Sequence, residues 1–241
     1  TQGVSGAGVV FTADGQYLQA EDSPSLNPTG ALTLAAWYRA ASFAGTGNDP
    51  IIDKGYLSHN PPYYQYHLGV TGDQYVNDPA SFSSSASVGG PIADSSTESG
   101  FWTAGNWYHI AAVYDGRSHC LFVDGEMVDM QLQTGEIDSF GRPLRIGGYT
   151  NFDRSLRGVI DEVRMYHRPL TCTEVTLLYE QHAACNPADL VRPFRVLDLA
   201  DVNSFTTGFL SMDPIADLNA DGLFDLSDIN LFVTSFVAGC P

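Results

Sequence analysis

The sequence predicts an all-β domain followed by a small α-helical unit. Three observations support this prediction. Short apolar stretches with alternating side chains, separated by turn-forming residues, run from Thr1 to about Arg168. Beyond Pro169 the apolar residues recur at helical spacing instead. A loop followed by a helix then occurs twice, and Asp201 and Asp228 hold equivalent places 27 residues apart.

Four segments of the first domain contain predicted β-strands. The segments 32–38 (LTLAAWY) and 107–114 (WYHIAAVY) each alternate two sets of side chains, as strands with one face in a core do. The segment 120–128 (CLFVDGEMV) predicts two strands joined at Asp124–Gly125, because this dipeptide favours a two-residue hairpin turn. The segment 158–166 (GVIDEVRMY) predicts a further strand.

Two long polar segments, 54–66 and 72–100, lie between these strands and are expected to be surface loops. A short helix is expected to close the domain, because Thr171 and Glu174 have the spacing of a capping box. The side chains that follow at helical spacing are Val175, Leu178, Tyr179 and His182. We therefore expect one domain over 1–182 and a second over 183–241.

Composition and charge restrict the classes of function. The chain of 241 residues has 28 acidic side chains against 11 Lys and Arg, a formal net charge of -17. This charge repels nucleic acids and anionic membranes at long range, so neither is expected as a partner. No apolar run approaches the roughly 20 residues that span a bilayer, and the chain opens on Thr1 without a basic, apolar leader. We expect a mature, secreted chain, extracellular or at the cell surface.

Four cysteines, Cys120, Cys172, Cys185 and Cys240, match no zinc-binding spacing. Their even number suits two disulfides in an oxidising compartment, and three pairings are open. Cys185 and Cys240 bracket the last segment of the chain, which favours that pair and leaves Cys120 with Cys172.

The segment 217–228 (DLNADGLFDLSD) predicts a calcium site. Side chains with oxygen atoms hold positions 1, 3, 5, 9 and 12 of this loop, and the Leu223 carbonyl holds position 7. Gly222 at position 6 permits the sharp turn that wraps the chain around a cation. The predicted side-chain ligands are Asp217, Asn219, Asp221, Asp225 and Asp228. The first copy, 189–201, has lost this ligand set, so we expect one calcium ion rather than two.

The duplicated loop and helix with a DxNxDG segment resembles a bacterial dockerin, and the flanking CNPADL and GCP resemble the variant with terminal cysteines. The resemblance implies an EF-hand-like helical domain that uses calcium and binds a cohesin-like protein. It also implies that side chains around the start of each helix recognise the partner. Those side chains are Leu199, Ala200, Leu226 and Ser227.

The first 182 residues resemble the LamG-like family of concanavalin A-like jelly rolls. The segments that carry the resemblance are 9–40, 51–55 (IIDKG), 107–116, 121–128 and 144–170. The resemblance implies an all-β jelly-roll sandwich. Because this fold hosts lectins, carbohydrate-binding modules, adhesion domains and some hydrolases and lyases, it leaves the activity open.

No pair of acidic residues has the pattern of a catalytic site. A hydrolase on this fold needs two carboxylates across the glycosidic bond. Glu136 with Asp138 lacks a further acid, and Asp161 with Glu162 matches non-catalytic LamG-like domains. We therefore expect no enzymatic activity. Asp161 is expected to form hydrogen bonds or to share a structural calcium ion with Asp14.

Aromatic side chains in the predicted loops favour glycan binding, because rings stack on sugar faces while polar groups hold hydroxyls. The candidates are Tyr56, Tyr63, Tyr64, Tyr66, Tyr75, Tyr149 and Phe152. The alternative for each ring is packing beneath the loops. Arg154 belongs to an arginine cluster with Arg142, Arg145 and Arg157, which either contacts a ligand or pairs with acidic neighbours.

The leading hypothesis is a protein that binds an extracellular polysaccharide or another glycan and assembles through its second unit. The proposed partner of that unit is a cohesin-like protein. The alternative is a structural subunit of an extracellular fibre or surface layer, in which both units contact neighbouring copies of the chain.

Overall fold

The computed structural model describes residues 1–42, 49–55, 63–71, 81–97, 102–149, 155–192 and 194–240. The chain divides into two compact units, Thr1–Tyr179 and Glu180–Pro241. The division falls inside helix α1 (Cys172–Ala183), a few residues before the boundary expected from the sequence.

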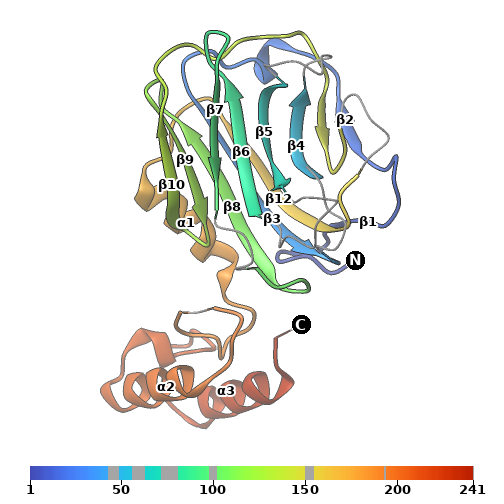
Figure 1. The fold of residues 1–241 in the computed structure, drawn as a ribbon. Coiled ribbons are helices and arrows are strands. Elements are labelled where there is room, and N and C mark those ends of the chain that lie inside the picture. The colour runs from blue at the N-terminus through green and yellow to red at the C-terminus, as the bar shows by residue number, and fades with distance from the viewer. Residues whose placement is uncertain are drawn as a thin grey trace. The chain divides into compact units, whose positions relative to one another are not determined.

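Two antiparallel sheets of six strands each make up the described part of the first unit (Figure 1). The first sheet has the order β1 (Val9–Phe11), β12 (Gly158–Tyr166), β3 (Leu32–Ala40), β8 (Trp107–Tyr114), β9 (Ser118–Val123) and β10 (Glu126–Leu132). The second sheet has the order β2 (Leu18–Ala20), β11 (Leu144–Ile146), β4 (Asp49–Gly55), β5 (Tyr64–Thr71), β6 (Ser81–Ser87) and β7 (Ile92–Ser96). A short 3-10 turn, η1 (Pro24–Leu26), precedes β3. The predicted all-β sandwich is confirmed.

Side chains of β3 and β8 alternate between the two faces of the first sheet, and both faces are apolar. Leu34 and Tyr38 point into the core between the sheets together with Ile110 of β8. Ala35 and Ala111 point to the other face, where they pack with α1. A strand covered on both sides reads as a nearly continuous apolar run, which is why β3 is buried almost throughout.

Helix α1 begins as the sequence predicts. The Thr171 backbone N–H donates to the Glu174 carboxylate at 2.8 Å, and the Glu174 N–H donates to the Thr171 hydroxyl at 3.2 Å. Val175 then packs on the outer face of the first sheet, and the Tyr179 ring stacks on Trp37 with 5.6 Å between the centroids. The helix thus shields one sheet face from water.

The prediction of a loop over 72–100 is wrong for part of that segment, since β6 and β7 lie within it. β6 has the sequence SFSSSAS, which is poor in β-branched residues. Phe82 and Ala86 nevertheless lie in the core, and Ser84 between them hydrogen-bonds His119 of β9 at 2.8 Å. Pairing with β5 and burial therefore override the weak strand propensity of β6.

The second unit contains α2 (Leu199–Ser211), the 3-10 turn η2 (Pro214–Ala216) and α3 (Leu226–Ala238). The two long helices pack through equivalent residues, because the Phe205 and Phe232 rings stack with 4.2 Å between centroids. Helical spacing predicts an apolar stripe on each helix, one with Phe205 and one with Phe232, and this contact confirms that the two stripes pack together. Val233, which the same spacing places in the second stripe, is instead exposed.

His119 makes the stability of the first unit depend on pH. Its side chain is buried between the sheets, and burial lowers its pKa from 6.5 to about 4. The unfolded chain therefore binds this proton more readily, so stabilisation present above pH 6.5 is lost as the pH falls towards 4. We expect the unfolding free energy to fall by about 3 kcal/mol across this range because of His119.

Urea titrations followed by tryptophan fluorescence measure this effect, since Trp37, Trp102 and Trp107 all lie in the first unit. His119→Asn should flatten the pH dependence, and the exposed His167→Asn should leave it unchanged. An equally steep decline in the His119 variant would show that another group is responsible.

Candidate functional site

A row of six polar side chains crosses the outer face of the second sheet, one on each strand. Each member is the cross-strand partner of the next: Gln19, Arg145, Asp53, His67, Ser85 and Asp94. Cross-strand partners point to the same face of a sheet. The residues that alternate with His67, namely Tyr66 and Leu68, lie in the core. The polar row, as we call these six residues, therefore lies on the face turned away from the core.

The centre of the polar row is buried although it lies on an outer face. Asp53 is 0% and His67 is 2% exposed, and the His67 Nδ1 atom lies 3.5 Å from the Asp53 Oδ1 atom. Gly69 makes room for this arrangement, because a Cβ atom there would lie 2.5 Å from His67 Nε2 and 2.6 Å from the Asp49 carbonyl. The exposed ends of the row are Gln19 and Asp94.

Two tyrosine rings flank His67. The Tyr64 ring stacks on His67 with 4.5 Å between centroids, and the Tyr149 ring lies 6.2 Å from His67 at an interplanar angle of 6°. The two tyrosine rings are 6.4 Å apart and nearly parallel. We call Tyr64, His67 and Tyr149 the aromatic stack. It joins residues from β5 with the segment after β11.

The Tyr149 hydroxyl remains protonated. Burial raises its pKa far above the usual value, and the neighbouring Tyr64 hydroxyl and the carboxylates of Asp53 and Asp49 raise it further. A neutral phenol at this place can both donate and accept a hydrogen bond.

Arg145 lies beside the aromatic stack and is oriented by three neighbours. Its guanidinium carbon lies 3.7 Å from the centroid of the Tyr17 ring. Its Nε–H donates to Gln19 Oε1 at 2.9 Å, and an Nη1–H donates to the Tyr149 carbonyl. The site thus combines ring faces, a guanidinium, carboxylates and hydroxyls, which are the groups that bind sugars by stacking and by hydrogen bonds to hydroxyls.

The structure brings together some of the aromatic residues selected from the sequence. Tyr64 and Tyr149 meet in the aromatic stack. The ring centroid of the exposed Tyr63 lies 6.3 Å from that of Tyr64. The assignment of Tyr66 to a ligand-binding loop is wrong, because its ring is fully buried in the core and its hydroxyl donates to the Leu26 carbonyl. Four candidates lie outside the described residues: Tyr56, Tyr75, Phe152 and Arg154.

Asp53, His67 and Ser85 are site residues that the sequence did not predict. They are far apart along the chain, and only the pairing of β4, β5 and β6 aligns them. The sequence did contain a signal for two of them. Asp53 and His67 each follow or precede a core residue along a strand, and alternation of side chains then places them on the outer face.

The acidic residues weighed as catalytic or structural ligands have other partners. Asp138 accepts hydrogen bonds from the Ser87 hydroxyl at 2.6 Å and from the Gly90 N–H at 2.9 Å. Asp161 accepts from the Ser5 backbone N–H at 3.0 Å. Asp14 forms an ion pair with Arg157 at 3.2 Å.

The loop 217–228 curls around its own acidic side chains. Asp217 accepts the backbone N–H groups of Asp221 and Gly222 at 3.1 and 2.9 Å. Asp221 accepts the Leu223 N–H at 2.8 Å, and Asn219 Oδ1 accepts the Asp221 N–H at 3.0 Å. Each carboxylate oxygen retains capacity to accept, so this donor set fits a hard cation such as calcium.

Asp228 has a structural role that does not depend on a metal. Its Oδ1 accepts the Leu218 N–H and its Oδ2 accepts the Asp225 N–H. In the first copy, Asp201 makes the equivalent bonds to the N–H groups of Leu190 and Asp198, although that copy lacks the ligand set. Both carboxylates therefore join a loop to the first turn of its helix. The four residues assigned to partner recognition, Leu199, Ala200, Leu226 and Ser227, are all exposed.

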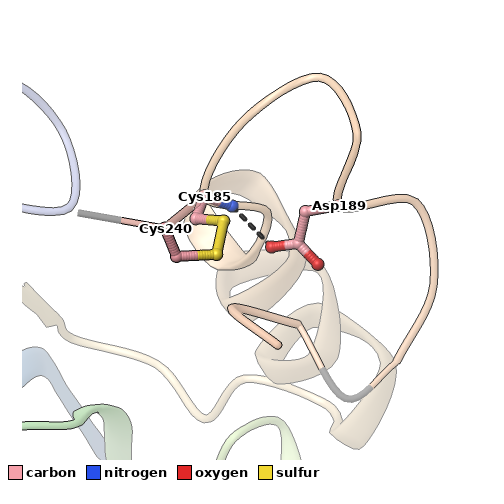
Figure 2. A group of neighbouring side chains, drawn as sticks. All are labelled: Cys185, Asp189 and Cys240. Atoms are coloured by element: carbon pink, nitrogen blue, oxygen red, sulfur yellow. Dashed lines mark hydrogen bonds between the residues drawn. A yellow bond between two sulfur atoms is a disulfide. The ribbon is translucent and has the colours of Figure 1, made fainter. Parts of the chain in front are cut away.

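The predicted disulfide between Cys185 and Cys240 is present and joins the two ends of the second unit. Figure 2 shows Asp189 beside it, with Oδ2 accepting the Cys185 N–H at 2.6 Å. Burial raises the pKa of Asp189. Within the described ranges, Cys185, Asp189 and Cys240 are the one group of His, Cys, Asp or Glu residues whose ligand atoms all lie within 4.8 Å of one another, and the two sulfur atoms are engaged in the disulfide. The first residue of the loop 189–201 is therefore hydrogen-bonded to a cysteine of the disulfide.

The expected second disulfide is not formed. Cys120 and Cys172 are free, the first partly buried on β9 and the second exposed at the start of α1. The pairing was predicted only because the number of cysteines is even. An even number says nothing about the distance between two cysteines in the fold, which decides whether a disulfide can form.

A family profile for the concanavalin A-like lectin/glucanases superfamily matches residues 12–176, more than half of the chain. The chain belongs to this superfamily. The two antiparallel sheets are therefore those of a concanavalin A-like domain. No curated protein matches the chain. None of the described helices is long and apolar enough to cross a membrane.

Solved structures share this concanavalin A-like fold at low sequence identity. Domain 4 of AbnA, a GH43 extracellular arabinanase from Geobacillus stearothermophilus in complex with arabinotriose, is 20% identical, with a TM-score of 0.55 over 74% of this chain and 79% of that one. The CBM40 of the Ruminococcus gnavus IT-sialidase is 14% identical, with a TM-score of 0.56 over 71% and 96%. The binding domain of Paraclostridial Mosquitocidal Protein 1 is 14% identical, with a TM-score of 0.60 over 77% and 46%.

The cysteine assignment predicts two titratable thiols per chain after denaturation without reductant, because one disulfide is present and two cysteines are free. In the native chain the exposed Cys172 should react with a thiol reagent faster than the partly buried Cys120. Cys172→Ser should lower the total to one. A count of zero in the wild type would show that Cys120 and Cys172 are joined.

Proposed function

We propose that this chain is an extracellular, non-catalytic protein that binds a glycan at the polar row of its first unit. The carrying observation is the aromatic stack of Tyr64, His67 and Tyr149 over a row of hydrogen-bonding side chains. Tyr64, the partly exposed ring of the stack, offers an apolar face to a sugar ring, while the guanidinium, carboxylate and hydroxyl groups nearby satisfy its hydroxyls.

The comparisons support this proposal without extending to a particular sugar. The arabinanase domain was solved with arabinotriose, and a further structure of the sialidase CBM40 holds α2,3-sialyllactose. Both are binding domains with the fold of this chain. The disulfide of the second unit supports an extracellular location.

The non-catalytic part of the proposal rests on the acids. Asp138 is held by Ser87 and Gly90, and Asp161 is held by the N-terminal segment at Ser5. Both carboxylates thus accept hydrogen bonds from the chain itself, whereas glycoside hydrolysis uses two carboxylates placed across the glycosidic bond.

We further propose that the second unit is a calcium-dependent, dockerin-type assembly module. Asp217, Asn219, Asp221, Asp225 and the Leu223 carbonyl would hold the ion with Asp228, and the ion would offset the repulsion among clustered carboxylates. The ligand set falls on a loop that already curls inward through its own hydrogen bonds.

Exposed apolar residues in equivalent places favour an assembly role for this unit. Leu199 and Leu226 open the two helices and are 70% and 72% exposed, and Leu210 and Val237 near the helix ends are 80% and 81% exposed. Exposed apolar side chains gathered in a small unit mark a protein contact. A cohesin-like protein or a neighbouring copy of the chain would cover them.

Sedimentation velocity of the chain with calcium distinguishes the two partners, because only association with a neighbouring copy increases the sedimentation coefficient of the chain alone. Leu226→Glu should weaken either association.

The aromatic stack should be required for glycan retention. We expect the double variant Tyr64→Ala/Tyr149→Ala to lose at least about tenfold in affinity, since one stacked ring contributes about 1–3 kcal/mol in comparable ring stacking. Titration calorimetry against a panel of oligosaccharides measures the loss, and tryptophan fluorescence checks that the first unit still folds.

The matched control is Tyr64→Phe/Tyr149→Phe, which keeps both rings and removes both hydroxyls. It should retain most of the affinity if stacking dominates. Undiminished affinity in the folded alanine variant would exclude the aromatic stack as the binding surface.

The second unit should bind one calcium ion, and Asp225 and Asp198 provide a matched test. Both are helix N-caps, accepting the N–H of Ser227 at 2.7 Å and of Ala200 at 2.6 Å. Asparagine also serves as an N-cap, so either substitution keeps the cap and removes one charge. Asp225→Asn should weaken calcium binding at least about tenfold, whereas Asp198→Asn should leave it unchanged.

Calorimetric titration of the full chain gives the stoichiometry and both affinities. Two ions per chain, none, or equal effects of the two substitutions would contradict the assignment. Asp228→Ala is a poor test, because Asp228 and its counterpart Asp201 also hold the loops.

A further inference from the structure

Arg145 is a partly buried arginine with no carboxylate within ion-pair distance among the described residues. Four other arginines do form such pairs: Arg157 with Asp14, Arg164 with Glu162, Arg168 with Glu174 and Arg192 with Glu180. With 28 acidic against 11 basic side chains, acidic partners are abundant. Arg145 is among the described arginines that form no such pair, and unlike the exposed Arg117 it lies partly buried beside the aromatic stack.

An acid is available next to Arg145. Asp53 is its cross-strand partner on β4, and both side chains lie on the outer face of the sheet. The Asp53 carboxylate lies instead 3.5 Å from the His67 ring, and the guanidinium turns the other way, to Gln19 on β2. The guanidinium is thus held apart from the one acid that the register places beside it.

Among the described residues, the neighbours of Arg145 use fewer than half of its hydrogen-bond donors. Gln19 Oε1 and the Tyr149 carbonyl accept two of its five N–H groups, and the Tyr17 ring supports its plane. The remaining donors keep their planar arrangement. A guanidinium fixed in this way matches a carboxylate, which accepts two parallel N–H bonds from it.

Arg145 and the aromatic stack are joined through Tyr149, whose carbonyl accepts from Arg145 and whose ring belongs to the stack. A sugar ring lying on the stack would carry a ring substituent towards the guanidinium. We infer that the glycan bound at the polar row contains a carboxylated sugar, such as a uronic or a sialic acid, and that Arg145 binds its carboxylate. This inference rests on the proposed glycan-binding function.

The charge of the chain limits the ligand to few carboxylates. A net charge of -17 repels a polyanion, but the repulsion between exposed charges is screened beyond about 8 Å at physiological ionic strength. The contact between Arg145 and one carboxylate is shorter than that distance. An oligosaccharide with a single terminal acid should therefore bind better than a polyuronate of the same sugar.

The test compares four probes by titration calorimetry: an oligosaccharide ending in a glucuronic acid, one ending in N-acetylneuraminic acid, and the form of each in which the carboxylate is reduced to an alcohol. The wild type should bind at least one carboxylated probe about tenfold or more tighter than its reduced form, because a hydrogen bond to a charged group is stronger than one to a neutral group. The two acidic arms identify the kind of sugar.

Arg145→Gln should abolish this preference and retain binding of the reduced probe. Arg145→Lys keeps the positive charge but loses the planar guanidinium that donates two parallel hydrogen bonds, so it should retain part of the preference. The control is Arg117→Gln, which removes an exposed arginine without an ion pair from the turn before β9 and should change nothing. Tryptophan fluorescence verifies folding of each variant.

A preference that survives Arg145→Gln, or equal loss of both probes in that variant, would overturn the inference. Binding of neutral oligosaccharides alone, dependent on Tyr64 and Tyr149, would overturn it and leave the proposed function standing. Failure of every probe to bind the wild type would count against both.

Discussion

The register of the second sheet is the constraint on which the site depends. A strand side chain alternates between two faces, so a slip by one residue would carry His67 into the core and Tyr66 out of it. Leu68 and Tyr66 hold the register, because both are fully buried between the sheets. The pairing of β5 with β4 and β6 then aligns Asp53, His67 and Ser85, which lie on three different strands.

Burying charged groups in this sheet has an energetic cost that local partners offset. Asp53 and His67 face each other at 3.5 Å on the outer side. On the core side, the buried Lys54 ammonium lies 2.6 Å from Asp22 and also donates to the Arg142 carbonyl. An uncompensated buried charge would be strongly destabilising. The two contacts of Lys54 therefore hold Asp22 and Arg142, which lie outside the strands, against the sheet.

The second unit reaches stability by a different route. Its core is small, and a small core needs a further constraint such as a disulfide or a metal. The Cys185–Cys240 bond closes the unit, and the stacked Phe205 and Phe232 rings occupy equivalent places in its two halves. The last acid of each loop, Asp201 or Asp228, is used as a helix-capping group in both copies. Duplication thus preserved the residue that shapes the loop, while the other ligand positions were free to diverge in the first copy.

Local pattern determined much of this protein. The strands over 32–38, 107–114 and 158–166, the Asp124–Gly125 turn and the capping box of α1 follow from spacing between near neighbours, and each is present. The disulfide of the second unit also follows from the position of two cysteines at its ends. By contrast, β6 and β7 are strands because neighbouring strands pair with them. Tyr66 is buried because β5 begins inside the segment 54–66, which the sequence predicts to be a polar loop.

Only the tertiary structure decided which polar residues share a surface. Arg145, Asp53 and His67 are separated by up to 92 positions, and their alignment is a property of strand order, not of any segment. The same holds for the free Cys120 and Cys172, whose number suggested a pair that their positions do not form. Sequence periodicity reports which face of an element is apolar, because that depends on residues a few places apart. Contacts between distant elements depend on how the whole chain packs, and that information is distributed over every residue of the core.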